Sequence, residues 1–386
     1  MRHEDAGLTV DAPVGMRVAV VAETFLPAVN GVVTSVLRLV DHLAVRGHDP
    51  VVVAPSGVGY ESRCGAQVEV VTVPTPRLPR YRQLAPARPA GDLTEVLRRL
   101  APDVVHLASP AVLGLAAAQA ARALGVPSVA VFQADLATYA QRYRLPGGAA
   151  AAWRYLRTVH GTADLTLAPS SATAAVLARQ GIGPIALWPR GVDRDQFAPC
   201  HRDEALRQQL APDGELLVGV VARLAAAKRL ELLAPLSALP GVRLVVVGDG
   251  PQRRHLTRAM PQARFLGQLG GAELGEVVAS LDLFVHPGAD ETFCQAVQEA
   301  LAAGVPAVVA AAGGPLDLVR HRENGWLWGG DDPHVLAAMV AGLRDDPGAL
   351  RAAAARARPS VDGRTWGRVG DELICHLQRL RSSVPT

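Results

Sequence analysis

The chain contains a single lysine, Lys228, beside 38 arginines. Where arginine is preferred this strongly, a position that stays lysine is one that needs a compact point charge rather than a planar guanidinium. Lys228 lies five residues after Arg223, and both follow an apolar run, residues 217–221, that is typical of a buried parallel strand. Two cations directly after a strand predict an anion site. The alternative is that Lys228 is an ordinary solvated helix residue.

A second group of candidates follows another predicted strand, residues 283–286. A Pro-Gly turn comes next, and Glu291 and Thr292 are expected to open a helix that runs to about residue 303. Backbone amides at a helix N-terminus bind phosphate oxygens readily. The amides expected in that position belong to Thr292, Phe293, Cys294 and Gln295.

Glu291 and Glu299 are eight residues apart, so on one helix both can point to the same side. Glu299 is surrounded by apolar residues in the sequence and therefore needs a polar partner. A carboxylate can accept hydrogen bonds from two neighbouring hydroxyls, and ribose supplies such a diol. The alternative is that Glu291 only caps the helix and Glu299 is a surface residue.

Short apolar runs recur along the chain with helical stretches between them, which predicts α/β architecture with parallel sheets covered by helices on both faces. The interval around residues 188–199 is rich in Pro, Gly and polar residues, and it divides the runs into two series. We therefore expect two doubly wound domains. The predicted strands are residues 18–22, 51–54, 68–73, 104–107, 128–132 and 165–168, then 217–221, 242–247, 263–266, 283–286 and 307–310.

Composition sets the remaining limits. A chain of 386 residues with 49% hydrophobic residues is globular and long enough for two domains. Its four cysteines are widely spaced, which favours neither a zinc site nor a disulfide framework and fits a cytoplasmic protein. Residues 1–15 are expected to be a loose tail without a secretory signal, and no transmembrane helix is predicted.

Charge is distributed unevenly between the two halves. Residues 1–190 carry 18 basic and 13 acidic side chains, and residues 191–386 carry 21 and 23. The excess is concentrated between Arg77 and Arg99, where leucines and a tyrosine are interspersed. This stretch could contact an anionic membrane surface or an anionic substrate, and a solvated loop is equally compatible. Nucleic acid is not an expected partner, because there is no aromatic stacking cluster and no basic recognition helix.

Taken together, these motifs resemble the retaining GT-B glycosyltransferases of family four. Arg223 and Lys228 match the diphosphate-binding Arg-x4-Lys pair of that family, and Glu291 and Glu299 match its two-glutamate signature. The similarity extends from Met16 to about residue 380 and includes residues 23–34, 245–250, 304–306 and 313–314. Residues 104–110, 132–135 with Tyr139, and 291–295 resemble the actinobacterial GDP-mannose-dependent α-mannosyltransferases that build membrane glycolipids.

The resemblance implies two Rossmann-like domains facing across a cleft: an acceptor-side domain over 16–189, a nucleotide-sugar domain over 190–360, and a last helix, 361–386, packing back on the first domain. It implies a nucleotide-sugar donor, GDP-mannose being favoured, and a hydroxyl acceptor, with a lipid-linked one expected. No metal is implied, because two fixed cations neutralise the diphosphate. The departing phosphate oxygen is expected to take the acceptor proton.

Further site residues come from the resemblance. Asn30 and Gly31, between the first strand and its helix, are expected near the donor phosphates or the acceptor, with a plain turn as the alternative. Asp135 is expected to contact the acceptor hydroxyl or to cap a helix. Gln133 stands where many family members have histidine; glutamine cannot titrate but can bond a sugar hydroxyl. Ala222 replaces the usual glycine before Arg223.

Two other functions remain open at this point. The protein could use a UDP-sugar to modify a soluble secondary metabolite, or it could bind a nucleotide sugar without catalysing transfer. The intact residues Arg223, Lys228, Glu291 and Glu299 argue against the second alternative.

Overall fold

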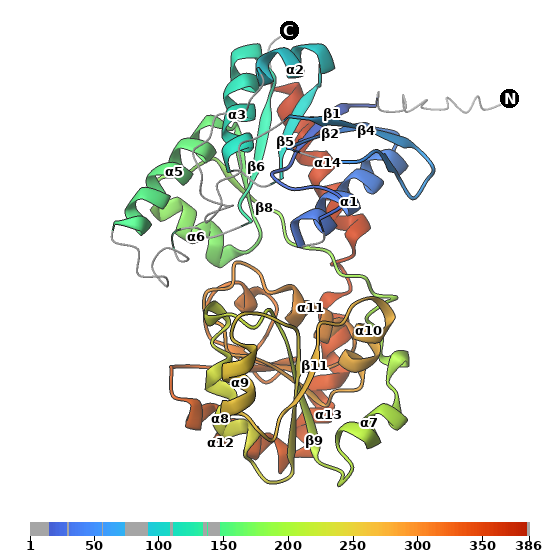
Figure 1. Ribbon diagram of the computed structural model, residues 1–386, viewed down its shortest axis with the longest axis vertical. Helices are drawn as coiled ribbons and strands as arrows, with labels where there is room; N and C mark the ends of the chain where they lie inside the picture. The colour runs from blue at the N-terminus through green and yellow to red at the C-terminus, as the bar shows by residue number, and fades with distance from the viewer. Residues whose placement is uncertain are drawn as a thin grey trace, which may run out of the picture. The chain divides into compact units, whose positions relative to one another are not determined.

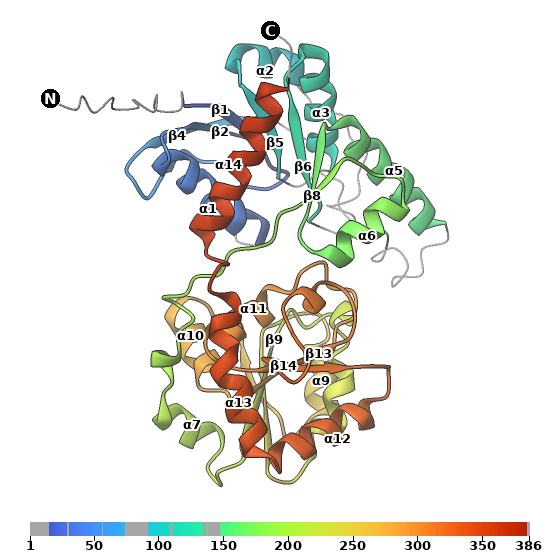
Figure 2. The ribbon, with the colours of Figure 1, turned by 180° about the vertical axis from the view of Figure 1, so that it is seen from behind.

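The computed structural model is shown in Figures 1 and 2 from opposite sides. It describes residues 15–28, 31–55, 57–73, 92–108, 111–133, 137 and 147–383. Asn30, Asp135, Tyr139 and the first part of the arginine-rich stretch, residues 77–91, lie outside the described residues.

The first sheet has eight strands in the order β3-β4-β2-β1-β5-β6-β7-β8. The pairs β1–β2, β1–β5, β2–β4 and β7–β8 are parallel, and the two-residue strand β3 runs antiparallel to β4. The strands are β1 Arg17–Val21, β2 Asp49–Ala54, β3 Tyr60–Glu61, β4 Gln67–Thr72, β5 Val104–Leu107, β6 Ser128–Val131, β7 Leu165–Ala168 and β8 Ile185–Leu187. The helices between them are α1 Gly31–Val45, α2 Leu93–Leu100, α3 Val112–Leu124, α5 Gly148–Thr162 and α6 Ser171–Arg179.

The second sheet has six strands in the order β11-β10-β9-β12-β13-β14, and all of its neighbours are parallel. Its strands are β9 Leu216–Val221, β10 Val242–Val247, β11 Arg264–Gly267, β12 Leu283–His286, β13 Ala307–Ala310 and β14 Gly325–Trp328. The α-helices around and after it are α7 Glu204–Leu210, α8 Ala234–Ser237, α9 Arg253–Ala259, α10 Gly271–Ala279, α11 Gln295–Ala302, α12 Pro333–Arg344, α13 Pro347–Ala357 and α14 Trp366–Ser382.

Burial on both faces explains why the strands of the second sheet are almost continuously apolar. Successive residues of β9 alternate between two cores: Leu217 joins the cluster that includes α10 and α11, and Val218 joins the one that includes α8 and α12. Phe284 and Val285 of β12 alternate in the same way. Since side chains in a strand point alternately to opposite faces, a strand that is covered on both sides has no polar face.

The prediction of two doubly wound parallel sheets is confirmed, and each predicted strand is found within about two residues of its expected ends. Three strands, β3, β8 and β14, were not predicted. By contacts the chain divides into one compact unit that runs up to Val129 and takes in the chain from Leu377, and a second unit, Ala130–His376. The domain limits and the cleft expected from the sequence remain predictions. No helix in the described ranges is long and apolar enough to cross a membrane.

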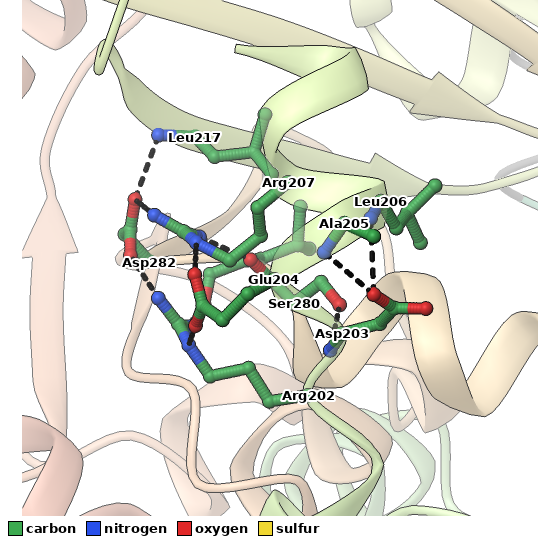
Figure 3. A network of polar contacts seen from close by, with 10 residues as sticks. Arg202, Asp203, Glu204, Ala205, Leu206, Arg207, Leu217, Ser280 and Asp282 are labelled. Atoms are coloured by element: carbon green, nitrogen blue, oxygen red, sulfur yellow. Dashed lines mark hydrogen bonds and ion pairs between the residues drawn. The ribbon is translucent and has the colours of Figure 1, made fainter. Parts of the chain in front are cut away.

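A polar network fixes the starts of the two central strands of the second sheet (Figure 3). Asp282, just before β12, accepts a hydrogen bond from the backbone amide of Leu217 in β9 at 2.9 Å. Its carboxylate is also paired with Arg207 at 3.0 Å and Arg202 at 3.2 Å. The network therefore holds β9 and β12 in register at the edge where both strands begin. The opposite edge, where they end, carries the candidate site.

Candidate functional site

The loop that carries Arg223 and Lys228 leaves the carboxyl end of β9 and is fixed by the loop after β10. The amide of Leu224 donates to the carbonyl of Asp249 at 2.9 Å. Gly248 has φ +129°, and a Cβ there would lie 2.0 Å from the carbonyl oxygen of Ala222, so this close approach requires glycine. A 3-10 turn, Ala226–Lys228, then presents the lysine. Among the described residues the exposed Arg223 guanidinium has no hydrogen bond or ion pair.

The loop that carries Glu291 leaves the end of β12 and is fixed by the glycine pair after β13. The amide of Gly314 donates to the carbonyl of Glu291 at 2.7 Å. Gly313 has φ +67°, and a Cβ on it would lie 2.6 Å from that same carbonyl oxygen. The carbonyl of Thr292 accepts a hydrogen bond from the hydroxyl of Ser170, the N-cap of α6, at 2.7 Å. The loop geometry is thus set by backbone contacts that side chains at Gly313 and Gly314 would prevent.

The two loops meet at the Glu291 carboxylate. The Lys228 Nζ lies 2.5 Å from Glu291 Oε1, and His286 Nε2 lies 2.8 Å from the same oxygen. Lys228 comes from the β9 loop, and His286 is the last residue of β12. The side chain of His286 is 2% exposed and that of Glu291 is 12% exposed. Two candidate residues that the sequence placed after different strands, Lys228 and Glu291, are therefore in direct contact.

These contacts shift the pKa values of the cluster. Burial by itself raises the pKa of Glu291, but the hydrogen bond and charge of His286 and the charge of Lys228 outweigh it and lower the pKa to about 2. Burial by itself lowers the pKa of His286, but the Cys294 sulfur and the Glu291 carboxylate outweigh it and raise the pKa to about 10. Glu291 is consequently held as a carboxylate beside two cations.

The helix after Glu291 starts later than the sequence predicted. The prediction placed its beginning at Glu291 and Thr292, whereas α11 begins at Gln295. Cys294 is the N-cap residue and has φ +81°, a left-handed conformation that interrupts the helical path. The prediction that amides 292–295 form the helix terminus is therefore wrong for residues 292–294. Among the described residues, the amides without a partner in the first turn are those of Gln295 and Ala296.

Glu299 lies in the interior of α11, so it does not share a helix with Glu291. Burial raises the pKa of Glu299 to about 7, which a hydrogen bond from the Gln295 side chain only partly counteracts. Gln295 itself donates from Nε2 to the carbonyl of Gly191 at 3.0 Å. Glu299 is thus a partly buried carboxylate with no ion pair to any described residue, and two ligand hydroxyls would suit it as donors.

One group of potential metal ligands occurs in the described chain. The ligand atoms of His286, Glu291 and Cys294 all lie within 4.8 Å of one another. The Lys228 ammonium is bonded to one oxygen of this same Glu291 carboxylate. An ammonium in that position repels a cation, so we describe the cluster as an ion-pair network and assign no metal ligands.

Comparison with known proteins identifies the family. Residues 29–196 match the model of Glycosyltransferase Family 4, and residues 201–360 match that of glycosyl transferases group 1. The chain belongs to glycosyltransferase family four. The recognition made on the Arg-x4-Lys and two-glutamate motifs is confirmed, and the protein is an enzyme of the glycosyltransferase class.

Two relatives are similar over nearly the full length of this family four enzyme. It is 47% identical over 365 residues to a GDP-mannose-dependent alpha-mannosyltransferase of Corynebacterium glutamicum, covering 94% of this chain and 88% of the relative. It is 47% identical over 376 residues to a protein of the same description from Mycobacterium tuberculosis, covering 96% and 99%. A solved structure of sucrose-phosphate synthase from Thermosynechococcus elongatus superposes with a TM-score of 0.79 at 18% identity, covering 95% and 100%. That likeness supports the GT-B fold alone.

The other predicted site residues of the family four enzyme are placed as follows. Gly31 opens α1 in an exposed position, and no atom lies within 4 Å of where a Cβ would stand. Gln133 follows β6, and its buried Oε1 has no hydrogen-bond partner among the described residues. The backbone of Phe293 lies against Gly314, and its ring belongs to the core. The roles given to Gly31, Gln133, Asn30 and Asp135 stay predictions.

His286 was expected only as the end of a strand, with no role in the site. Cys294 was expected to offer its backbone amide in the first turn of a helix, and not to interrupt the helical path. A titratable residue at the last position of a buried parallel strand was the available signal for His286, because ligands of such sheets bind beyond the carboxyl ends of strands. The left-handed backbone of Cys294 had no signal in the sequence, since glycine is the residue expected there.

Replacing Glu299 with glutamine is expected to stabilise the ligand-free enzyme at alkaline pH. The folded-state pKa of Glu299 is raised, so the stabilisation from its protonated form is present below about pH 4.5 and is lost as pH rises through about 7. Glutamine stays neutral, which removes a cost of up to about 3 kcal/mol at pH 8. Thermal unfolding at pH 5 and pH 8 checks this: the gap between variant and wild type should widen with pH. Glu276→Gln, on an exposed position of α10, is the control, and a pH-independent gap would contradict the assignment.

Proposed function

We propose that this family four enzyme transfers a mannosyl group from GDP-mannose to an acceptor hydroxyl with retention of the α configuration. The observation that supports the proposal most directly is the 2.5 Å hydrogen bond from Lys228 Nζ to Glu291 Oε1. Arg223 lies on the same loop as Lys228. Two cations and a charged carboxylate at the carboxyl edge of one sheet can receive a sugar diphosphate. Both relatives described above are 47% identical to this chain and are GDP-mannose-dependent alpha-mannosyltransferases.

The diphosphate is the leaving group, and its developing charge needs fixed donors. Arg223 is exposed and has no partner among the described residues, so its guanidinium can turn to a phosphate. Lys228 is 30% exposed and follows five residues later in the same loop. The amides of Gln295 and Ala296 at the start of α11 supply further donors. Each such donor contributes about 3–4 kcal/mol to transition-state stabilisation in comparable sites.

The two glutamates are assigned to bind different parts of the donor. Glu299 would accept from the ribose diol, and Glu291 would accept from a hydroxyl of the transferred sugar. The bond between the anomeric carbon and the phosphate oxygen breaks, and the acceptor oxygen bonds to that carbon on the same face. The acceptor proton passes to the departing phosphate oxygen. Because the acceptor enters on the face from which the phosphate leaves, the α linkage of the donor is retained in the product, and no protein nucleophile is needed.

A thermal-shift panel of GDP, UDP, GDP-mannose and UDP-glucose tests the donor. A ligand present at about 100 times its dissociation constant stabilises the protein by about 2.7 kcal/mol. We expect stabilisation by GDP and GDP-mannose and a smaller effect of the uridine compounds. A preference for UDP-glucose would favour the alternative, a UDP-sugar enzyme that acts on a soluble acceptor. Binding without GDP release on addition of acceptors would favour a non-catalytic homologue.

The acceptor is proposed to be lipid-linked. The support is the charge of the sequence: residues 1–190 carry the basic excess, and six arginines occur between Arg77 and Arg99. The described end of this stretch is α2, which buries Leu93, Leu97 and Leu100 and exposes Arg98 and Arg99. Each basic residue near an anionic surface contributes about 1 kcal/mol to binding.

Co-sedimentation with phosphatidylglycerol vesicles tests the membrane contact. We expect binding at low salt that weakens at high salt and with Arg77, Arg80 and Arg82 replaced together by alanine. Phosphatidylcholine vesicles are the matched control surface. No binding to the anionic vesicles at low salt would favour a soluble acceptor.

A further inference from the structure

His286 makes a contact that the proposed function does not yet use. Its Nε2 and the Lys228 Nζ both bond to one oxygen of Glu291, Oε1, at 2.8 and 2.5 Å. Among the described residues the second oxygen, Oε2, has no partner. Two donors on one carboxylate oxygen fix the orientation of the carboxylate and leave Oε2 as the oxygen that can receive a ligand.

The two donors are held very differently. His286 ends β12, pairs in register with Val309 of β13, and is 2% exposed. Gly288 leaves room for its contact, because a Cβ there would lie 2.9 Å from His286 Nε2 and 3.3 Å from Glu291 Oε1. Lys228 is 30% exposed in a single 3-10 turn and ends in a flexible four-carbon chain. His286 is the fixed donor, and Lys228 is the donor that can turn away.

We propose that His286 is a positioning residue that carries a proton and keeps Glu291 charged when Lys228 leaves it for the diphosphate of the donor. The proposal rests on the proposed function, because only a diphosphate gives Lys228 a reason to turn. A buried carboxylate that lost its sole cation would take up a proton and lose its strength as an acceptor. The His286 imidazolium prevents this, because it stays hydrogen-bonded to Oε1.

The titratable groups facing His286 act in opposite directions. Glu291 from the β12 loop and Cys294 at the N-cap of α11, whose ligand atoms lie within 4.8 Å of one of its ring nitrogens, favour the protonated form. The Lys228 ammonium, bonded to the same Glu291 oxygen, disfavours it, and the buried Nδ1 of His286 has no hydrogen-bond partner among the described residues. Burial opposes protonation, yet the net effect of these neighbours is a raised pKa for His286. No arginine or second histidine of the described chain bonds to the ring.

The test is the pH dependence of turnover in His286→Asn. Asparagine can still donate a hydrogen bond but cannot carry charge. We expect kcat at pH 7 to fall at least about 10-fold and to recover as pH rises. The acid limb of the plot of kcat against pH should move up by about one pH unit or more. A loss of kcat that is equal at every pH would show a merely structural role and overturn the proposal, as would unchanged kcat.

The matched control is His160→Asn, which removes another buried histidine, bonded to Thr166 at 3.1 Å, and should leave the acid limb in place. If His286→Asn does not fold, the protonation state of His286 is measured instead, by ¹⁵N NMR of wild-type enzyme that carries labelled histidine, with GDP bound, at pH 8. A ring protonated on both nitrogens supports the proposal, and a neutral ring overturns it. Wild-type enzyme that releases no GDP from GDP-mannose would instead overturn the proposed function, and the spectrum without nucleotide would still test the charge of His286.

Discussion

Lys228→Ala is expected to lower kcat/KM for the donor at least about 100-fold while leaving the fold intact. The variant loses the ammonium proposed to neutralise the diphosphate, and removal of one such donor costs on the order of 10²–10³ in rate. It also removes one of the two donors on Glu291 Oε1. Lys228→Arg should recover little, because the planar guanidinium is larger than an ammonium and spreads its charge, so it cannot supply one compact charge at the diphosphate.

Initial rates of GDP release with varied GDP-mannose measure this effect. Arg368→Ala is the matched control, since Arg368 is an exposed cation of α14 paired with Glu372, and its loss should leave the rate within about twofold. Thermal unfolding of each variant separates loss of activity from loss of fold. Lys228→Ala with the wild-type rate would remove the basis for the diphosphate assignment.

Glu291→Gln is expected to lower kcat about 100-fold with a smaller change in KM. Glutamine is neutral, so it cannot form the charged contacts that Glu291 makes with Lys228 and His286. The transferred sugar also loses a charge-assisted hydrogen-bond acceptor. Glu299→Gln should instead raise KM for the donor, because a neutral amide keeps one ribose hydrogen bond and loses the charge.

Steady-state kinetics of the two glutamine variants at pH 7.5 separate these roles, since KM reflects binding when chemistry is slow and kcat reflects the bound complex. The pair forms its own control, because each variant makes the same chemical change eight residues from the other. If both variants change kcat and KM alike, the separate roles of sugar and ribose acceptor are wrong.

The strands could be predicted because burial on both faces leaves a continuous apolar run, as in β10 and β13. Two of the missed strands, β3 and β8, have only two and three residues, which is too short for such a run. β3 is a two-residue antiparallel edge, and β14 is a Gly-Trp-Leu-Trp segment whose place depends on pairing with β13. Short elements of this kind are decided by the neighbouring strand and not by local sequence.

The site could be predicted as a set of residues but not as a geometry. Lys228 stood out by composition, and its contact with Glu291 joins segments 63 residues apart. The start of α11 was misplaced because Cys294 adopts φ +81°. The residue before it, Phe293, packs its backbone against Gly314 and its ring in the core, contacts that the local sequence does not reveal. The role of His286 depends on the 2.8 Å contact between its Nε2 and Glu291 Oε1. That contact exists only when the loop after β12 has folded, so the sequence does not reveal it.

The anomeric configuration of the product tests the central claim most directly. Purified enzyme would be incubated with GDP-mannose labelled with ¹³C at the anomeric carbon and with a membrane lipid extract, and the product would be examined by NMR. The account predicts GDP release in step with a new α-mannoside, and at least about 100-fold slower product formation by Lys228→Ala. A β-mannoside, or the absence of any mannoside while UDP-glucose under the same conditions yields a glucoside, would contradict it.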